Sequence, residues 1–164
     1  MDAADLHAAK LEQLVRELAR VGLKARAMHA VDWRVGAGEV TETYDRVLVD
    51  APCSGTGTLR RRPELQTRRV AEDLASLSSL QLAIVSRAAE RVRPGGHLVY
   101  AVCSVLREEA EDVAAAFVAA HPEFAPAPFE GEAARALAGD ATTLRLLPGV
   151  HGTDGYFVAS FARA

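Results

Sequence analysis

The sequence predicts a three-layer α/β domain whose sheet is mostly parallel and ends in an antiparallel hairpin. Two observations support this prediction. Short apolar runs alternate with longer segments in which apolar residues recur at helical spacing. Near the C-terminus, two strand-like runs flank a turn rich in glycine. Strands that alternate with helices are typical of a parallel sheet covered on both faces, and the hairpin adds an antiparallel end.

Composition limits the class of protein further. The chain has 164 residues, of which 49% are apolar, so we expect one domain with a sizeable core. A net charge of -3 argues against a uniformly basic nucleic-acid-binding protein, although it leaves room for a local basic patch. Two cysteines cannot form a disulfide framework. The sequence lacks a secretion-signal pattern and the run of about 18 apolar residues that a membrane helix needs, so we predict a soluble, cytoplasmic protein.

The N-terminal region is predicted to contain a strand end, a helix and a second strand. Residues 1–4 are expected to be the last part of a strand. Over residues 6–21, apolar side chains recur at helical spacing, and Gly22 follows them as a stop signal. Residues 24–31 are a candidate strand that leads to Asp32.

The central region contains the clearest strand, at residues 46–50, where the run is apolar and ends at a proline-containing turn. A basic segment at 56–69 is expected to be a loop. Residues 70–92 have apolar residues at helical spacing and predict a long helix. A Pro-Gly-Gly turn at 94–96 then leads into a second strand at 98–102.

The C-terminal region begins with a helix at 107–120, which is rich in alanine and glutamate. Residues 121–140 are rich in proline and alanine, so we expect a surface linker with one short helix. The runs at 144–147 and 156–161 are the two strands of the closing hairpin.

Two cysteines stand at the ends of the predicted central strands. Cys53 follows the strand 46–50, and Cys103 follows the strand 98–102. In an open α/β sheet, ligands bind at the carboxyl ends of the strands. A single cysteine in such a place is more often a buried core residue than a reactive one. Two of them on one edge can converge in one pocket, which favours catalysis.

Several kinds of cysteine chemistry can be weighed from the residues alone. The turn after Cys53 has the glycines of an anion cradle, but the arginine that a phosphatase needs would fall at Leu59, and Arg60 is one position too late. No Gly-Lys-Ser/Thr follows the glycines, so the segment is not a Walker loop. A redox pair remains an alternative, although the sequence has no Cys-x-x-Cys motif to support it. Zinc is disfavoured because the histidines show no ligand spacing.

Four motifs carry a resemblance to a known family. They are DAPCSGTG at 50–57, RRRPE at 60–64, YAVCSVLREE at 100–109 and GTDGYF at 152–157. In content, order and spacing they resemble the Sun-type RNA (cytosine-5) methyltransferases, which are ribosomal RNA small-subunit methyltransferase B-like. The resemblance covers nearly the whole chain. It implies a Rossmann-like class I methyltransferase fold.

The family's chemistry, carried over residue by residue, assigns a role to each thiol. The Cys103 thiolate would add to carbon 6 of a cytosine, so that carbon 5 becomes nucleophilic and takes a methyl group from S-adenosylmethionine. A second group would assist loss of the carbon 5 proton, and Cys53 would assist the release of the enzyme by elimination. The related DNA enzymes use the opposite order of cysteines, which stays as an alternative. Asp50 would lie between the methyl donor and the base, its alternative being a turn-forming residue.

The resemblance also places residues for the cofactor. Asp5 matches the family's acid for the ribose hydroxyls, because two acceptor oxygens suit a diol. Asp32 matches the residue that contacts the adenine amino group. Asp50 and Pro52 complete the expected cofactor residues. Without the resemblance, Asp5 reads equally well as a helix N-cap and Asp32 as a solvent-facing loop acid.

One dense basic patch adjoins the Cys53 turn. We expect it to bind phosphates of RNA, which by resemblance is ribosomal RNA, and its alternative is a solvated face. The target cytosine would have to be unstacked or flipped out. The patch consists of Arg60, Arg61, Arg62, Arg68 and Arg69.

The chain departs from the family in several places. The glycine-rich cofactor loop, the strand before it, the lysine after it and the N-terminal RNA-binding region are missing, and Val102 replaces a threonine. We therefore expect residues 1–164 to form one incomplete catalytic domain, with an exposed sheet edge that can pair with a second chain. The competing classes are a non-catalytic RNA- or partner-binding remnant and, more distantly, a cysteine hydrolase without a suitably placed histidine.

Overall fold

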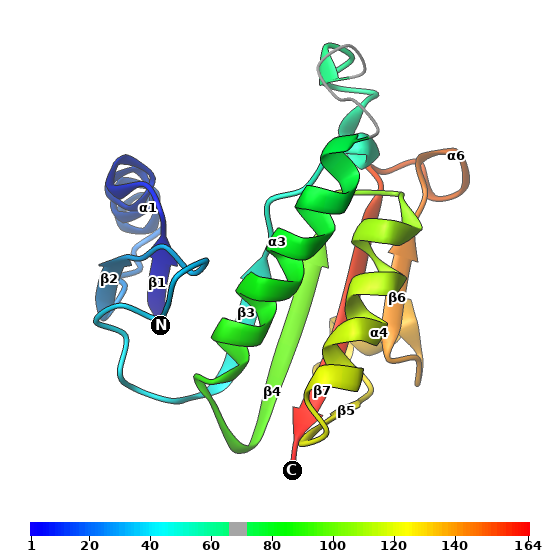
Figure 1. Ribbon diagram of the computed structural model, residues 1–164. Helices are drawn as coiled ribbons and strands as arrows, with labels where there is room; N and C mark the ends of the chain where they lie inside the picture. Colours follow the sequence, from blue (N-terminus) through cyan, green and yellow to red (C-terminus); the bar gives the residue numbers. More distant parts are fainter. Residues whose placement is uncertain (66–71) are drawn as a thin grey trace. The chain divides into compact units, whose positions relative to one another are not determined.

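The computed structural model describes residues 1–65 and 72–164 (Figure 1). Two of the predicted RNA-binding residues, Arg68 and Arg69, lie outside the described residues. The chain divides into two compact units, Met1–Glu42 and Thr43–Ala164. Each unit has its own sheet. In the described part of the chain, no helix is both long and apolar enough to cross a lipid bilayer.

The first unit is a strand–helix–strand arrangement. Strands β1 (Asp2–Asp5) and β2 (Ala27–Ala30) pair in parallel, and helix α1 (Ala8–Arg20) connects them. The helix ends as predicted. Gly22 has a φ of 73°, and the N–H groups of Gly22 and Leu23 donate to carbonyls of the last turn of α1. This glycine-terminated C-cap satisfies carbonyls that would otherwise face no partner.

The second unit is built on a five-stranded sheet with the order β3-β4-β7-β5, and β6 pairs with β7. The β3–β4 pair is parallel, whereas β7 is antiparallel to β4, β5 and β6. The sheet is therefore mixed and not mostly parallel as the sequence suggested. The reason is that the last strand returns between β4 and the shorter strands. The strands are β3 (Tyr44–Asp50), β4 (Val92–Val102), β5 (Phe124–Pro126), β6 (Thr143–Leu146) and β7 (Tyr156–Arg163).

Two helices lie on the same face of this sheet, as Figure 1 shows. They are α3 (Glu72–Ala89) and α4 (Glu111–Ala120). The third layer expected from the sequence stays a prediction. The shorter elements of the unit are the single-turn 3-10 helices η1 (Thr56–Thr58) and η2 (Arg107–Glu109) and the helices α5 (Glu132–Ala138) and α6 (Pro148–His151).

A cluster of aromatic residues packs α4 against the sheet. The Phe117 ring lies 5.2 Å from that of Phe124 and 5.0 Å from that of Phe161, and all three side chains are buried. This packing explains why β5 forms within the segment that we expected to be a surface linker. Burial of Phe124 draws the chain onto the edge of the sheet. The short helix expected in the same segment is present as α5.

The predicted helix and strand boundaries near Pro94 were partly wrong. Helix α3 ends at Ala89, and β4 already begins at Val92. The Pro-Gly-Gly segment is an irregularity within β4, where the register against β3 shifts. Gly95 has a φ of 74°, which favours glycine. The strand is thus longer than the sequence indicated, and a bulge replaces the expected turn.

Candidate active site at the ends of β3 and β4

Both cysteines lie at the carboxyl ends of neighbouring parallel strands. Asp50 ends β3 and is in register with Ala101 near the end of β4, which Cys103 directly follows. The Sγ atoms of Cys53 and Cys103 are 3.3 Å apart, and both thiols are free and half-buried. This distance suits a hydrogen bond and is longer than the roughly 2.0 Å of a disulfide. The prediction that the two thiols converge is confirmed.

The two thiols differ in their electrostatics. The pKa of Cys103 is lowered to about 7, mainly because the Cys53 thiol donates a hydrogen bond to it; burial and the charge of Asp50 oppose the shift. The same interaction, with burial second, raises the pKa of Cys53 above its usual range. Near neutral pH, Cys103 is therefore the stronger nucleophile, and Cys53 keeps its proton.

Two loops are locked together beside the thiols by glycine backbone. Gly57 donates its N–H to the carbonyl of Cys103 at 3.1 Å, and its carbonyl accepts the N–H of Gly155 at 2.8 Å. A Cβ added at Gly57 would lie 2.1 Å from the carbonyl oxygen of Gly155. Position 57 therefore needs glycine for close backbone approach. This contact joins the DAPCSGTG and GTDGYF motifs in space.

A buried carboxylate lies beneath the cysteine loops. Glu109 is fully buried in η2. It accepts hydrogen bonds from the N–H and hydroxyl of Ser54 at 2.7 and 2.5 Å, and from the hydroxyl of Ser104 at 2.6 Å. The side-chain amide of Gln81 on α3 adds a further hydrogen bond at 2.9 Å. These donors compensate the cost of removing the carboxylate from water.

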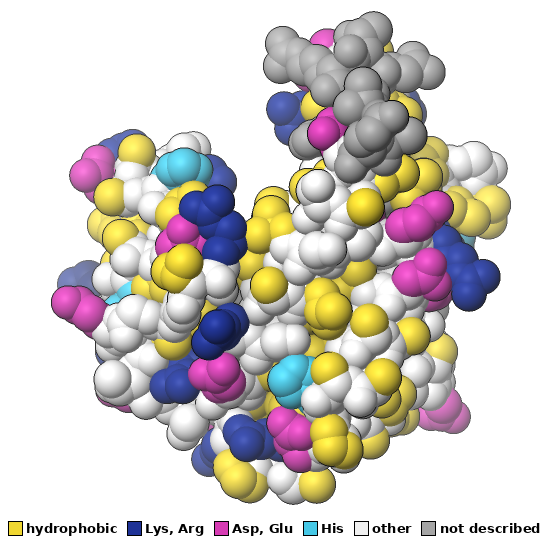
Figure 2. All heavy atoms as spheres, viewed as in Figure 1, with side chains coloured by type: hydrophobic (Ala, Val, Ile, Leu, Met, Phe, Trp, Pro, Cys, Tyr) yellow, Lys and Arg dark blue, Asp and Glu magenta, His cyan; other side chains and the backbone are white. Residues whose placement is uncertain are grey.

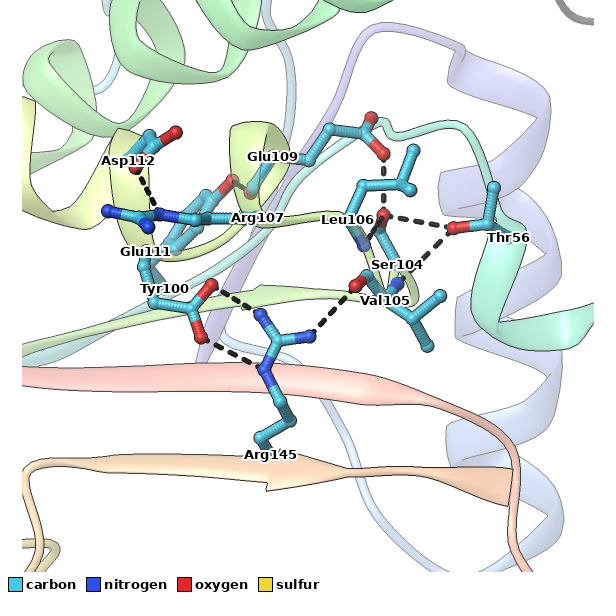
Figure 3. Close-up of polar contacts among 10 residues, drawn as sticks. All are labelled: Thr56, Tyr100, Ser104, Val105, Leu106, Arg107, Glu109, Glu111, Asp112 and Arg145. Atoms are coloured by element: carbon cyan, nitrogen blue, oxygen red, sulfur yellow. Dashed lines mark hydrogen bonds and ion pairs between the residues drawn. The ribbon is translucent and has the colours of Figure 1, made fainter. Parts of the chain in front are cut away.

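Two further side chains complete this polar cluster. Thr56 accepts the N–H of Val105 at 3.2 Å and is 3.1 Å from the Ser104 hydroxyl (Figure 3). The Tyr100 hydroxyl donates to the carbonyl of Glu109 at 2.6 Å. Burial raises the pKa of Tyr100 well above its usual range, so Tyr100 stays a neutral donor. The loop after β3 and the loop after β4 are thus tied by side chains as well as backbone.

An ion pair supports the loop that follows Cys103 from the other side. Arg145 of β6 pairs with Glu111 of α4 and donates to the carbonyl of Val105 at 2.9 Å (Figure 3). Its guanidinium also lies over the ring of Phe157, 5.5 Å from the ring centre. Together with Arg107, these charged residues line a shallow pocket next to the loop.

The described arginines of the basic patch are exposed but partly neutralised. Arg60 and Arg61 both pair with Asp154, whose side chain is 8% exposed, and Arg62 pairs with Glu64. On the face shown in Figure 2, Lys and Arg side chains are interspersed with Asp and Glu. The three described arginines of the patch are therefore paired cations and do not form a continuous positive field among themselves.

The predicted adenine- and ribose-binding acids lie in the first unit. Asp5 ends β1, and its carboxylate accepts the N–H of His7 at 2.8 Å and lies 3.5 Å from Lys10. His7 is the residue at the N-cap, so Asp5 is not the N-cap itself. Asp32 is bound on both oxygens by Arg34, which lowers the pKa of Asp32 to about 2. Both carboxylates keep exposed acceptor oxygens, so they fit a cofactor's hydroxyl and amino donors.

Asp50 and Pro52 are both exposed. The role of Asp50, whether beside the base or in forming the turn, stays a prediction. The carbonyl of Pro52 accepts the side-chain amide of Gln81 at 2.9 Å. Among the described residues there is no group of three or more potential metal ligands.

The sequence did not single out the buried members of the site. Ser54, Ser104 and Glu109 stand inside the quoted motifs, but only the cysteines were given roles there. Gln81 had no motif at all. Its one signal is that a polar residue occupies a buried position on a helix whose other buried residues, Val85, Ala88 and Ala89, are apolar. Such a residue needs partners, and here they are the Pro52 carbonyl and Glu109.

Comparison with solved structures defines the class of protein. The crystal structure of PH0851 superimposes with a TM-score of 0.84 at 32% sequence identity, covering 98% of this chain and 36% of that one. NSun6 from Pyrococcus horikoshii with SFG gives a TM-score of 0.79 at 25% identity, covering 99% and 41%. The fold is therefore that of a Rossmann-like class I methyltransferase.

Sequence comparison defines the family. The model of the family described as 16S rRNA methyltransferase RsmB/F matches residues 1–162, and the chain belongs to this family. Probable ribosomal RNA small subunit methyltransferase B of Bacillus subtilis is 38% identical over 165 residues. Ribosomal RNA small subunit methyltransferase B of Shewanella oneidensis is 35% identical over 162 residues. These matches cover 97% and 99% of this chain but 36% and 37% of the relatives, so the chain spans about a third of their length.

Proposed function

We propose that the chain carries the methyl-transfer chemistry of an RNA (cytosine-5) methyltransferase, with ribosomal RNA as substrate and S-adenosylmethionine as cofactor. The observation that carries the proposal is the pair of thiols 3.3 Å apart whose pKa values are shifted in opposite directions. Membership in a 16S rRNA methyltransferase family supports the substrate. A ribosomal RNA substrate also agrees with the cytoplasmic location that the sequence predicts.

In this proposal Cys103 is the nucleophile. Its Sγ, held as a thiolate by the hydrogen bond from Cys53, forms a bond to carbon 6 of cytosine, and the electron pair of the ring double bond moves to carbon 5. S-adenosylmethionine, when bound, supplies the methyl group that carbon 5 takes. Asp50, exposed at the end of β3, contacts the cytosine edge.

Cys53 acts in the release step. Its raised pKa depends on the neighbouring Cys103 thiolate. Once Sγ of Cys103 is bonded to carbon 6, that stabilisation of the Cys53 proton is lost, so its pKa falls and the proton passes to solvent. The Cys53 thiolate then accepts the proton of carbon 5, the double bond re-forms, and the bond between carbon 6 and Cys103 breaks to return the thiolate.

The remaining residues are proposed to bind. Asp5 accepts the ribose hydroxyls, and Asp32 accepts the adenine amino group, which must share the carboxylate with Arg34. Pro52 lines the cofactor side of the turn. The arginines of the basic patch contact RNA phosphates; they are Arg60, Arg61, Arg62, Arg68 and Arg69. When RNA binds, phosphate partly replaces Asp154 as the partner of Arg60 and Arg61.

The test combines cofactor binding with trapping of the covalent adduct. Calorimetric titration of S-adenosylmethionine into the chain should show saturable binding that Asp32→Ala weakens. With ribosomal RNA and cofactor, Cys53→Ala should accumulate an RNA–protein adduct that survives denaturing electrophoresis, and Cys103→Ala should form none. An adduct formed by Cys103→Ala and not by Cys53→Ala would favour the order of the DNA enzymes. RNA binding without cofactor binding or methylation would favour a non-catalytic binding role.

Self-association through a sheet edge is a separate part of the proposal. In the strand order of the second unit, β3 is a terminal strand, and its Leu48 is 69% exposed. An unpaired edge with an apolar side chain invites pairing with a second chain. Sedimentation equilibrium should show a dimer that Leu48→Lys dissociates, and a monomer at all concentrations would contradict the pairing.

A further inference from the structure

One side chain contacts the residues that directly follow both thiols. Glu109 Oε1 accepts the N–H of Ser54, the neighbour of Cys53, at 2.7 Å. Its Oε2 accepts the hydroxyl of Ser104, the neighbour of Cys103, at 2.6 Å. Because the carboxylate is planar and fully buried, it fixes both attachments relative to each other. Loss of this side chain would therefore allow the two cysteine loops to move independently of each other.

Gln81 extends the same support to the other side of Cys53. Its side-chain amide donates both to Glu109 Oε1 and to the carbonyl of Pro52, each at 2.9 Å. The backbone before Cys53 and the backbone after it are thus held by two side chains that are bonded to each other. Gln81 projects from α3, a long helix packed on the sheet, so the anchor of the cluster is rigid.

We propose that Glu109 is a positioning residue that sets the distance between the two thiols through Ser54, Ser104 and Gln81. The inference deepens the proposed function and rests on it, since the distance matters for catalysis only if Cys103 and Cys53 act together. Glu109 itself is bonded to the loops and not to the sulfur atoms, so it acts through its neighbours.

A purely structural role would have a different signature. It would lower the stability of the folded chain and leave the distance between the thiols in the folded state unchanged. The reaction of the two thiols with each other separates the roles, because its rate depends on their mutual approach. Diamide oxidises the pair in two steps: one thiolate adds to its N=N bond, and the other thiol then attacks that sulfur, so that a Cys53–Cys103 disulfide forms and the reagent leaves as a hydrazine with the two electrons and two protons. The rate is measured at diamide concentrations at which the second step limits it, because only this step depends on the approach of the two thiols.

The experiment measures the rate of this disulfide formation in the 164-residue chain, folded and reduced, without RNA or cofactor. Peptide mapping identifies the Cys53–Cys103 bond. Glu109→Ala should slow it by at least about tenfold, since a displacement of about 1 Å is enough to cost a reaction on the order of a hundredfold. The matched control is Glu108→Ala, whose exposed side chain leaves the rate unchanged.

Glu109→Gln should restore most of the rate. Its amide oxygen can accept from Ser54 and Gln81, and its NH2 can donate to the two serine hydroxyls, which turn to accept. Rates are compared over a pH series, because the charge of Glu109 also raises the pKa of both thiols. The series separates a change in thiolate fraction from a change in distance.

Two results would overturn the inference. One is a folded Glu109→Ala chain that couples its thiols at the wild-type rate, with folding checked by cooperative unfolding. The other is Glu109→Gln reacting as slowly as Glu109→Ala. If Glu109→Ala does not fold, Ser104→Ala takes its place: it removes the bond to Oε2 and should slow coupling severalfold, and an unchanged rate would again overturn the inference. Since the assay needs no methylation, its outcome is independent of the adduct test.

Discussion

Two carboxylates, Glu109 and Asp32, show how differently the two units of the chain use a negative charge. Glu109 is fully buried, and its partners come from the loop after β3, the loop after β4 and helix α3. Asp32 is 26% exposed at the side chain and is paired with Arg34, two residues away. The first carboxylate ties distant segments together. The second is held by its own loop, which leaves it free to exchange partners for a ligand.

This difference sets the scale of what mutation should do in each unit. A buried acceptor has no water to replace a lost partner, so the cost of removing it falls on every donor that it served. Removal of one partner of an exposed ion pair lowers the stability of the fold little, because water and salt already screen the interaction. The effects below should therefore decrease from the buried cluster to the exposed pair.

The largest effect is expected from Glu109→Ala. The substitution leaves the Ser54 N–H and one of the two bonds of the Gln81 amide without an acceptor, and it opens a space in the interior. Each unsatisfied buried donor costs about 1–3 kcal/mol, so the free energy of unfolding should fall by about 3 kcal/mol or more. Urea denaturation checks this. A loss as small as that of Glu108→Ala would mean that the cluster does not hold the fold.

A smaller loss of stability is expected from Gly57→Ala. Its Cβ would meet the carbonyl oxygen of Gly155 at 2.1 Å, and backbone on both sides has little freedom to yield. Overpacking of this kind costs about 1–3 kcal/mol. Gly149→Ala is the control, since a Cβ there meets nothing within 4 Å. Equal midpoints of thermal unfolding for the two variants would show that the loops that contain Gly57 and Gly155 can move apart without a loss of stability.

How much of this could be read from the sequence depends on whether a feature is local. The Gly22 stop, the strands before the cysteines and the closing hairpin follow from short patterns, and the structure confirms them. The strand at Phe124 was missed because its burial is decided by Phe117, on another element. The direction of β7 against β4 depends on strand order, which no periodicity encodes.

The residues of the candidate site also fall into a part that the sequence predicts and a part that it does not. The motifs indicated that Cys53 and Cys103 would converge, since both follow parallel strands. They did not indicate that Glu109 and Gln81 would meet beneath them, because a buried polar residue is recognisable only once its partners are known. The pairing of Arg61 with Asp154 joins two motifs that the sequence analysis treated separately.

A change of reactivity, with little change of fold, is expected from Cys53→Ala. Loss of the hydrogen bond from Cys53 should raise the pKa of Cys103 from about 7 toward the ordinary value of about 8.5. A raised pKa means less thiolate near neutral pH, so alkylation of Cys103 by iodoacetamide slows there and converges with the wild type at alkaline pH. Cys53→Ser, which keeps a donor, should be intermediate. An unshifted pH profile would show that Cys53 does not lower the pKa of Cys103.

The smallest effect is expected from Arg34→Ala in the first unit. The side-chain bonds from Arg34 are the main reason for the low pKa of Asp32, so the substitution should raise this pKa from about 2 toward the ordinary value of about 4. The rise should be partial, because the N–H of residue 34 still donates to Asp32. A carboxyl group whose pKa is depressed in the folded chain contributes stability above its ordinary pKa of about 4 and loses that contribution as pH falls toward 2. The variant should therefore be slightly less stable than the wild type at neutral pH, and the difference should disappear in acid. NMR titration of the Asp32 carboxyl measures the shift, with Arg20→Ala as a control whose pair with Glu17 is separate. A carboxyl that still titrates near 2 in the variant would mean that the loop backbone, and not the Arg34 side chain, lowers the pKa of Asp32. The contrast between Asp32 and Glu109 would then be one of burial alone.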